Sequence, residues 1–195
     1  MFIRLLLIAS LTLSSGLTYA KVDPELRKYL SSAINSTSSF TDRFEAEVWL
    51  VDMSARLSRY IKDKEFRVEF LKALHQAATK ENLPPEMVLA LINIESAFKP
   101  YAISRVGAQG YMQIMPFWRN EIGRPDDNLM DYKTNLRYGC AILAHYLKRE
   151  KGNWTRALAR YNGSLGKTWY PEKVMNAWQK RWFVQHISSL KNHIP

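Results

Sequence analysis

The sequence contains only one cysteine, Cys140, among 195 residues. One cysteine cannot form a disulfide within the chain, which excludes a small secreted scaffold stabilised by disulfides. Stability must therefore come from a core, and a chain that is 47% hydrophobic can build one. Cys140 lies in an apolar helical run, so we interpret it as a small buried side chain and not as a nucleophile.

The chain also lacks an apolar run of the length that a membrane-spanning helix needs, about 20 residues. Near the N terminus, Arg4 precedes an apolar stretch at 5–13, and Thr-Tyr-Ala at 18–20 is a small-residue cleavage site. This pattern is typical of a secretory signal peptide, so we expect residues 1–20 to be removed on export. An uncleaved anchor is the alternative. No cysteine stands at the cleavage point, so a lipoprotein anchor is not indicated.

Acidic residues are in short supply. There are 18 Asp and Glu against 28 Lys and Arg, a net charge of +10, and removing Arg4 with the signal lowers it to +9. A protein this basic favours an anionic partner. Export and the absence of a nucleic-acid-binding motif argue against nucleic acid.

Hydrophobic spacing predicts a mainly helical domain. Apolar residues recur at intervals of three and four in the segments 41–61, 64–80, 84–95, 134–149 and 154–160. We expect Thr41 to cap the first helix and Asp131 to precede the fourth. In the tail, 170–186, apolar and aromatic residues share one side. We expect this helix to pack on the domain, with contact to a membrane surface as the alternative.

One carboxylate stands out at the end of an apolar helix. Val88, Leu91, Ile92 and Glu95 are spaced so that they share one helix face. Partial burial there disfavours the charged form of Glu95 and raises its pKa, which a general acid needs near neutral pH. The alternative is a solvated ion pair with Lys99, four residues on.

The segment after this carboxylate carries a dense motif, ESAFKPYAISRVGAQGYMQIMP, from Glu95 to Pro116. It closely resembles the signature of the soluble-type (SLT) lytic transglycosylases, which are related in fold to goose-type lysozymes. The matching residues are Glu95, Ser96, Phe98, Pro100, Ala102, Ser104, Gly107, Ala108, Gly110, Met112, Gln113, Met115 and Pro116. Tyr111 departs from the family's usual Leu, and its larger ring is expected to alter the floor of the groove.

Weaker matches follow along the chain, so that the resemblance covers about 83–178. Asn135 and Gly139 resemble the family's Asn-x-x-x-Gly helix, and Tyr170 with Val174 its last short motif. A third element, Ala-x-Tyr-Asn-Ala-Gly, is matched at Ala159, Tyr161 and Asn162, with Gly-Ser in place of Ala-Gly.

The resemblance implies a mainly α, lysozyme-like helical domain with at most a small β element, near 108–115. We expect the signal peptide at 1–20, a helical extension packed on the domain at 21–82, and the catalytic domain with a C-terminal helix at 83–195.

The implied activity is cleavage of the β-1,4 bond between N-acetylmuramic acid and N-acetylglucosamine in peptidoglycan, with formation of a 1,6-anhydro ring. Glu95 would be the catalytic acid and base, and the Tyr161 hydroxyl would hydrogen-bond its carboxyl group. The residues expected to bind substrate are Ser96, Ser104, Gln113, Met115, Tyr161 and Asn162. The partner would be glycan strands in the bacterial periplasm or cell wall.

Two other functions remain open at this point. A lysozyme-type hydrolase would use Glu95 with water and a second carboxylate, Asp126 or Asp127, although Asp in such a loop is more often a turn residue. A non-catalytic cell-wall-binding protein would keep only the fold. The sequence carries no metal-ligand cluster and no phosphate-binding loop, so we expect no metal and no cofactor.

Overall fold

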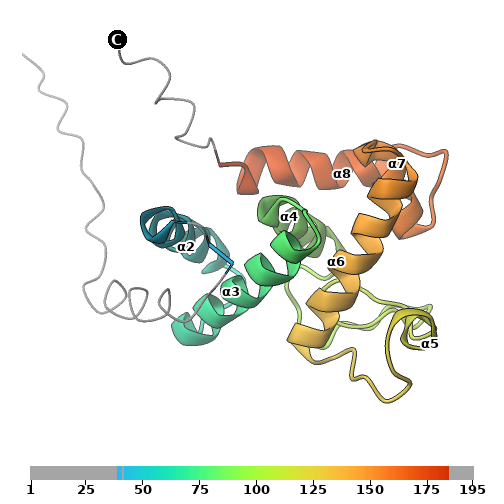
Figure 1. The fold of residues 1–195 in the computed structure, drawn as a ribbon, viewed down its shortest axis with the longest axis horizontal. Coiled ribbons are helices and arrows are strands. Elements are labelled where there is room, and N and C mark those ends of the chain that lie inside the picture. The colour runs from blue at the N-terminus through green and yellow to red at the C-terminus, as the bar shows by residue number, and fades with distance from the viewer. Residues whose placement is uncertain (1–38, 41, 185–195) are drawn as a thin grey trace, which may run out of the picture.

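The computed structural model describes residues 39–40 and 42–184 (Figure 1). The predicted signal peptide lies outside the described residues. The helices are α2 (Arg43–Leu57), α3 (Lys64–Lys80), α4 (Pro85–Glu95), α5 (Trp118–Ile122), α6 (Tyr132–Arg149), α7 (Trp154–Asn162), α8 (Trp169–Ala177) and the π-helix η1 (Trp178–Trp182). Between α4 and α6, Gln109 forms isolated antiparallel bridges with Ile103 and Ile114. The prediction of a mainly α fold with at most a small β element is confirmed.

Short polar side chains begin several of these helices by accepting a hydrogen bond from a free backbone N–H group. Asp131 caps α6 by accepting from the N–H of Thr134 at 2.8 Å, which confirms that it precedes this helix. Asp42, and not Thr41, caps α2, accepting from the N–H of Glu45 at 2.9 Å. Its carboxylate is the stronger acceptor, and it lies at the position that a cap requires.

Helix α4 lies in the middle of the fold, where α3, α8 and η1 pack against it (Figure 1). Val88, Leu89, Ala90, Leu91 and Ile92 are completely buried, as the all-round apolar sequence of this helix requires. The core is one continuous cluster that also includes side chains of α2 and α3. The catalytic candidate Glu95 is therefore placed by the most deeply buried helix of the domain.

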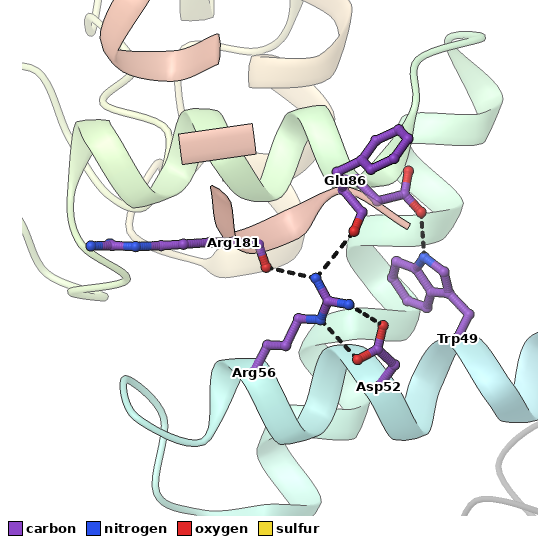
Figure 2. Close-up of polar contacts among 6 residues, drawn as sticks. Trp49, Asp52, Arg56, Glu86 and Arg181 are labelled. Atoms are coloured by element: carbon purple, nitrogen blue, oxygen red, sulfur yellow. Dashed lines mark hydrogen bonds and ion pairs between the residues drawn. The ribbon is translucent and has the colours of Figure 1, made fainter. Parts of the chain in front are cut away.

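Buried polar contacts join α2 to the rest of the fold. The Arg67 guanidinium on α3 donates to the Ser54 hydroxyl at 3.0 Å. The Trp49 indole N–H donates to the buried Glu86 carboxylate at 2.6 Å, a contact between α2 and α4 (Figure 2). Because buried polar groups are costly unless they are paired, these bonds fix how α2 packs.

The C-terminal segment differs from the single helix that the sequence predicts. Helix α8 ends at Ala177 and continues as the π-helix η1, after which Phe183 adopts an extended backbone. Trp182 is 1% exposed and packs against Phe98, which confirms that the tail packs on the domain. None of the helices in the described ranges is long and apolar enough to cross a membrane.

Candidate active site

Glu95 is the last residue of α4, at the point where the chain leaves the core. Its carboxyl group accepts a hydrogen bond from the Tyr170 hydroxyl on α8. Burial raises its pKa to about 7, and the hydrogen bond from Tyr170 opposes part of this rise. Among the described residues, no Lys or Arg forms an ion pair with Glu95, so the alternative pair with Lys99 is not found.

The backbone turns sharply directly after the carboxylate. Ala97 and Phe98 have φ angles of 50° and 60°, a left-handed conformation that costs energy for residues with a side chain. Phe98 is 3% exposed, and its ring packs 4.9 Å from that of Tyr60. Core packing of Phe98 thus offsets the strain and fixes where α4 ends. The turn sends the following residues back across the end of the helix.

Hydrogen bonds fasten the returning segment on several sides. The buried Ser96 hydroxyl donates to the Tyr111 carbonyl oxygen at 2.7 Å. The Met112 N–H donates to Oδ1 of Asn135 at 2.7 Å, and the Met112 carbonyl accepts from the Tyr161 hydroxyl at 2.8 Å. Helices α4, α6 and α7 therefore all position the motif beside Glu95.

Asn135 satisfies three backbone groups at once. Besides accepting from Met112, its side-chain amide donates to the carbonyl oxygens of Gln109 (2.9 Å) and Leu129 (2.8 Å). Asn135 is completely buried, so this network is shielded from water. A Cβ atom on Gly110 would lie 2.5 Å from the Asn135 amide nitrogen, which explains why glycine, with φ of +74°, is required at this position.

Gly139, one turn further along α6, likewise allows a neighbouring side chain to lie very close to the helix. A Cβ atom there would lie 2.2 Å from the Met112 sulfur. Glycine at this position therefore lets the Met112 side chain pack directly against α6. Tyr111 turns inward as well: it is 1% exposed and its ring centroid lies 4.7 Å from that of Phe70. Its ring belongs to the core, where an apolar side chain would also fit.

The tyrosine that contacts Glu95 is not the one that the resemblance implied. Tyr161 donates to Met112, whereas Tyr170 donates to the Glu95 carboxyl group. The expected hydrogen bond from Tyr161 to Glu95 was therefore wrong. Burial, followed by the nearby Glu95 charge, raises the pKa of both tyrosines well above 10, so both remain hydrogen-bond donors near neutral pH. The match of Tyr170 to the family's last motif was the available signal, and it carried no assigned role.

The remaining predicted residues fall into two groups. The Ser104 hydroxyl accepts from the Ala108 N–H at 3.0 Å, and the Gln113 amide donates to the Gly110 carbonyl at 2.9 Å, so both close turns of the motif. Met115 is half-buried, and Asn162 is exposed at the end of α7. Ser96, Ser104 and Gln113 support the loop, while the side chains of Met115 and Asn162 make no hydrogen bond within the described residues.

After Asn162 the sequence has Gly-Ser where the family has Ala-Gly, and these two residues end helix α7. Gly163 adopts a left-handed conformation with φ of 77° and ends α7, and the Ser164 N–H donates to the Ala159 carbonyl at 2.7 Å. This is the usual way in which a glycine terminates a helix. The element after Asn162 is therefore well formed with Gly-Ser in place of Ala-Gly.

Exposed apolar side chains, which the sequence did not single out, lie on segments that adjoin these residues. Trp169 is 47% exposed and directly precedes Tyr170, while Tyr101 and Ile103 in the motif are 76% and 66% exposed. An exposed aromatic ring is suited to pack against the apolar face of a sugar. Single exposed residues are common on protein surfaces, so periodicity alone could not identify them.

The carboxylates of the loop before α6 do not form a second acid–base group. Asp127 is 9% exposed and accepts from the Tyr138 hydroxyl at 2.6 Å and from Arg137 at 2.9 Å. These hydrogen bonds hold the pKa of Asp127 down to about 2. Asp127 thus ties the loop to α6, and Asp126 is exposed. Within the described ranges, no group of three or more His, Cys, Asp or Glu side chains could bind a metal ion.

The raised pKa of Glu95 predicts how stability depends on pH. Between pH 4.5 and about 7 the folded protein binds a proton at Glu95 that the unfolded chain has lost, so the free energy of unfolding falls as pH rises and then levels off. At about 1.4 kcal/mol per pH unit, the loss is about 1 to 3 kcal/mol. Urea unfolding at pH 5 and pH 8 should show Glu95→Gln losing less stability than the wild type. The exposed Glu121→Gln variant is the control, and equal losses in all three proteins would refute the prediction.

Comparison with known proteins places this chain in a family. The model of the transglycosylase SLT domain matches residues 72–182, more than half of the chain. A transglycosylase of Enterobacteria phage PRD1 is 32% identical over 114 residues, covering 55% of this chain and 42% of that protein. Membrane-bound lytic murein transglycosylase D of Escherichia coli K12 is 28% identical over 148 residues, 72% of this chain and 32% of that protein.

Among solved structures, the 70-kDa soluble lytic transglycosylase of Escherichia coli is similar at 21% identity with a TM-score of 0.44, covering 80% of this chain and 27% of that one. The chain spans less than half the length of each of these relatives.

Proposed function

The chain belongs to the transglycosylase SLT domain family, and from this membership we propose that it is a peptidoglycan lytic transglycosylase. It cleaves the β-1,4 bond between N-acetylmuramic acid and N-acetylglucosamine without water and leaves a 1,6-anhydromuramoyl end. The observation that carries the proposal is the half-buried Glu95, with a pKa of about 7 and no cationic partner among the described residues.

The first chemical step uses the protonated form of Glu95. Its proton passes to the glycosidic oxygen as the bond from that oxygen to C1 of the muramoyl sugar breaks, and N-acetylglucosamine leaves. Positive charge develops at C1, and the carbonyl oxygen of the substrate's own N-acetyl group bonds to C1 to meet it. Because a pKa near 7 keeps a large fraction of Glu95 protonated at neutral pH, the acid is available where an ordinary glutamate would be ionised.

The second step uses the ionised form. Glu95 takes the proton of the muramoyl 6-hydroxyl, the oxygen of this hydroxyl attacks C1, and the bond from C1 to the acetyl oxygen breaks. The anhydro ring closes, Glu95 is protonated again, and no water is consumed. One carboxylate is sufficient because the nucleophile belongs to the substrate, and this agrees with the structural role of Asp127.

The resemblance and the surface suggest where the glycan lies. We place Met115 and Asn162 on the sugar groove, with Ser96, Ser104, Gln113 and Tyr161 as residues that position its wall. The exposed side chains of Trp169, next to Tyr170, and of Tyr101, within the motif, would extend this surface. The basic chain suits a substrate whose peptides carry carboxylates. We also propose that the protein acts after export, in the bacterial periplasm or cell wall.

The proposal is tested by incubating the protein with purified peptidoglycan and measuring the soluble fragments that it releases. Release that depends on Glu95 supports the proposal. Binding to peptidoglycan without any release would instead identify a non-catalytic wall-binding protein.

The hydrogen bond from Tyr170 predicts a change in the pH profile. This bond lowers the pKa of Glu95, so Tyr170→Phe raises that pKa further. The alkaline limb of kcat/KM, where the acid loses its proton, should move to higher pH. Tyr161→Phe is the matched control, because its hydroxyl contacts Met112 and not Glu95, and it should leave the limb in place. A limb that moves equally in both variants, or in neither, would contradict the assignment of Tyr170.

A further inference from the structure

A basic pocket of about 420 Å³ lies between the end of α2 and the π-helix η1. Its lining residues are Arg56, Arg59, Lys180, Arg181 and Trp182. Four of the five side chains are cationic, and they come from two segments that are far apart in the sequence. The family motif of the active site includes none of them, and the catalytic mechanism does not use them.

Two of the arginines are fixed in place by the fold. Arg56 donates to both carboxylate oxygens of Asp52, at 2.8 and 2.7 Å, and to the carbonyl oxygens of Arg181 (2.8 Å) and Phe183 (3.2 Å) (Figure 2). These bonds attach the end of η1 to α2. The side chain of Arg181 extends away from the Arg56 guanidinium in the same view (Figure 2). It donates to the Tyr60 hydroxyl at 3.0 Å and to Oδ1 of Asn93 at 3.2 Å.

The positive charge of the pocket is only partly neutralised. Asp52 compensates Arg56, whereas the partners of Arg181 are uncharged. Among the described residues, no carboxylate pairs with Arg59 or Lys180, and the sequence after Val184 contains no Asp or Glu. Four cations and one carboxylate leave a net charge of +3 around one pocket.

We propose that this pocket binds a phosphoryl group, with Arg59, Lys180 and Arg181 as donors to its oxygens. A phosphate carries about −1.5 to −2 charge near neutral pH and three strong acceptor oxygens, which suits several cationic donors that line one pocket. A single carboxylate would leave most of the positive charge uncompensated. Arginine adds a planar fork that matches two phosphate oxygens, and because Arg181 is already held by neutral groups, little ordering is needed on binding.

The pocket is separate from the catalytic carboxylate. Asn93, which accepts from Arg181 and from the Trp182 indole N–H at 3.3 Å, is two residues before Glu95 on α4. Residues two apart on a helix do not share a face, so Asn93 and Glu95 are directed to different sides of α4. The phosphate site can therefore be tested independently of the proposed transglycosylase activity.

The experiment is a titration of the full chain with inorganic phosphate at constant ionic strength. Binding is measured by calorimetry or by the fluorescence of the nearby tryptophans. Acetate is titrated in the same way, to compare the affinity for a carboxylate with the affinity for phosphate. We expect saturable phosphate binding that is weakened at least about tenfold in the double variant Arg59→Gln, Lys180→Gln, because charge-assisted hydrogen bonds are lost. The exposed pair Lys148→Gln, Arg149→Gln removes the same charge from α6 and should leave the affinity unchanged.

Three results would overturn the proposal: no saturable binding of phosphate, equal weakening in both double variants, or acetate binding as tight as that of phosphate. Vesicles of phosphatidylglycerol and of phosphatidylcholine distinguish the source of the group. If the protein binds the anionic vesicles and added phosphate releases it from them, the phosphoryl group belongs to a lipid headgroup. If the protein binds phosphate but not the vesicles, the ligand is a soluble phosphate. Either result supports the site. Glu95→Gln should keep the phosphate affinity even if the proposed catalytic role of Glu95 fails.

Discussion

Replacing Glu95 by glutamine is expected to lower the rate of fragment release from peptidoglycan by at least 10²-fold, and by about 10⁴-fold if no other acid substitutes. The amide keeps the size of the side chain and can still accept from Tyr170, but it can neither give nor take a proton. Because the same carboxylate serves as acid and then as base, both steps lose their proton transfer. Initial rates of soluble muropeptide release at pH 6 measure the effect.

The controls for this experiment separate catalysis from folding and from charge. Glu121→Gln removes an exposed carboxylate from α5 and should retain the wild-type rate. Asp126→Asn tests whether an exposed carboxylate of the next loop assists, and it too should retain the rate. Circular dichroism should show that the Glu95 variant is folded. A folded Glu95→Gln protein that releases fragments at the wild-type rate would remove Glu95 from the mechanism.

Replacing Asn135 by leucine is expected to destabilise the protein by about 2 to 6 kcal/mol, because two buried backbone groups lose their hydrogen-bond partner at about 1 to 3 kcal/mol each. These groups are the Met112 N–H and the Leu129 carbonyl, whereas the Gln109 carbonyl keeps the hydrogen bond from the Ile114 N–H at 2.9 Å. Leucine has the same number of side-chain heavy atoms and the same branching at Cγ, so the loss reflects the polar network more than a cavity. Urea unfolding at pH 6 gives the change in the free energy of unfolding.

Asn128→Ala is the matched control for this substitution. The Asn128 side chain accepts one exposed hydrogen bond, from the Met130 N–H at 2.9 Å, so its loss should cost less than about 1 kcal/mol. Fragment release should also fall in Asn135→Leu below its unfolding midpoint, since the motif beside Glu95 loses its attachment to α6. Similar small losses in both variants would show that the network does not hold the motif.

Helices α2, α3, α4, α6 and α7 were predictable from sequence because each has a periodic apolar face and several have a clear cap, whereas the short helix α5 has no buried side chain and no capping side chain to mark it. Glu95 could also be identified, since its place on the apolar stripe of α4 already implied a raised pKa, and the structure raises that pKa to about 7. The predicted cap of α2, Thr41, is one residue away from the observed cap, Asp42, because two residues that can cap a helix are adjacent in the sequence. Boundaries of this kind depend on local geometry that periodicity does not specify.

The hydrogen-bond partners within the site were harder to predict. Tyr161 and Tyr170 are both buried tyrosines near Glu95, and which of them reaches the carboxyl group depends on how α7 and α8 pack against α4. The resemblance implied sugar contacts for Ser104 and Gln113, and the structure adds that their polar groups close turns of the motif. The choice between the two tyrosines rests on contacts between segments that are distant in the sequence, and no local pattern encodes it.

The most direct test of the proposed function is the mass of the fragments released from purified peptidoglycan. Ring closure by the muramoyl 6-hydroxyl predicts products that are one water lighter than hydrolysed fragments and lack a reducing end. These products should be absent with Glu95→Gln. Products with ordinary reducing ends would contradict the proposal and would identify the protein as a hydrolase in which water, and not the substrate's own hydroxyl, attacks C1.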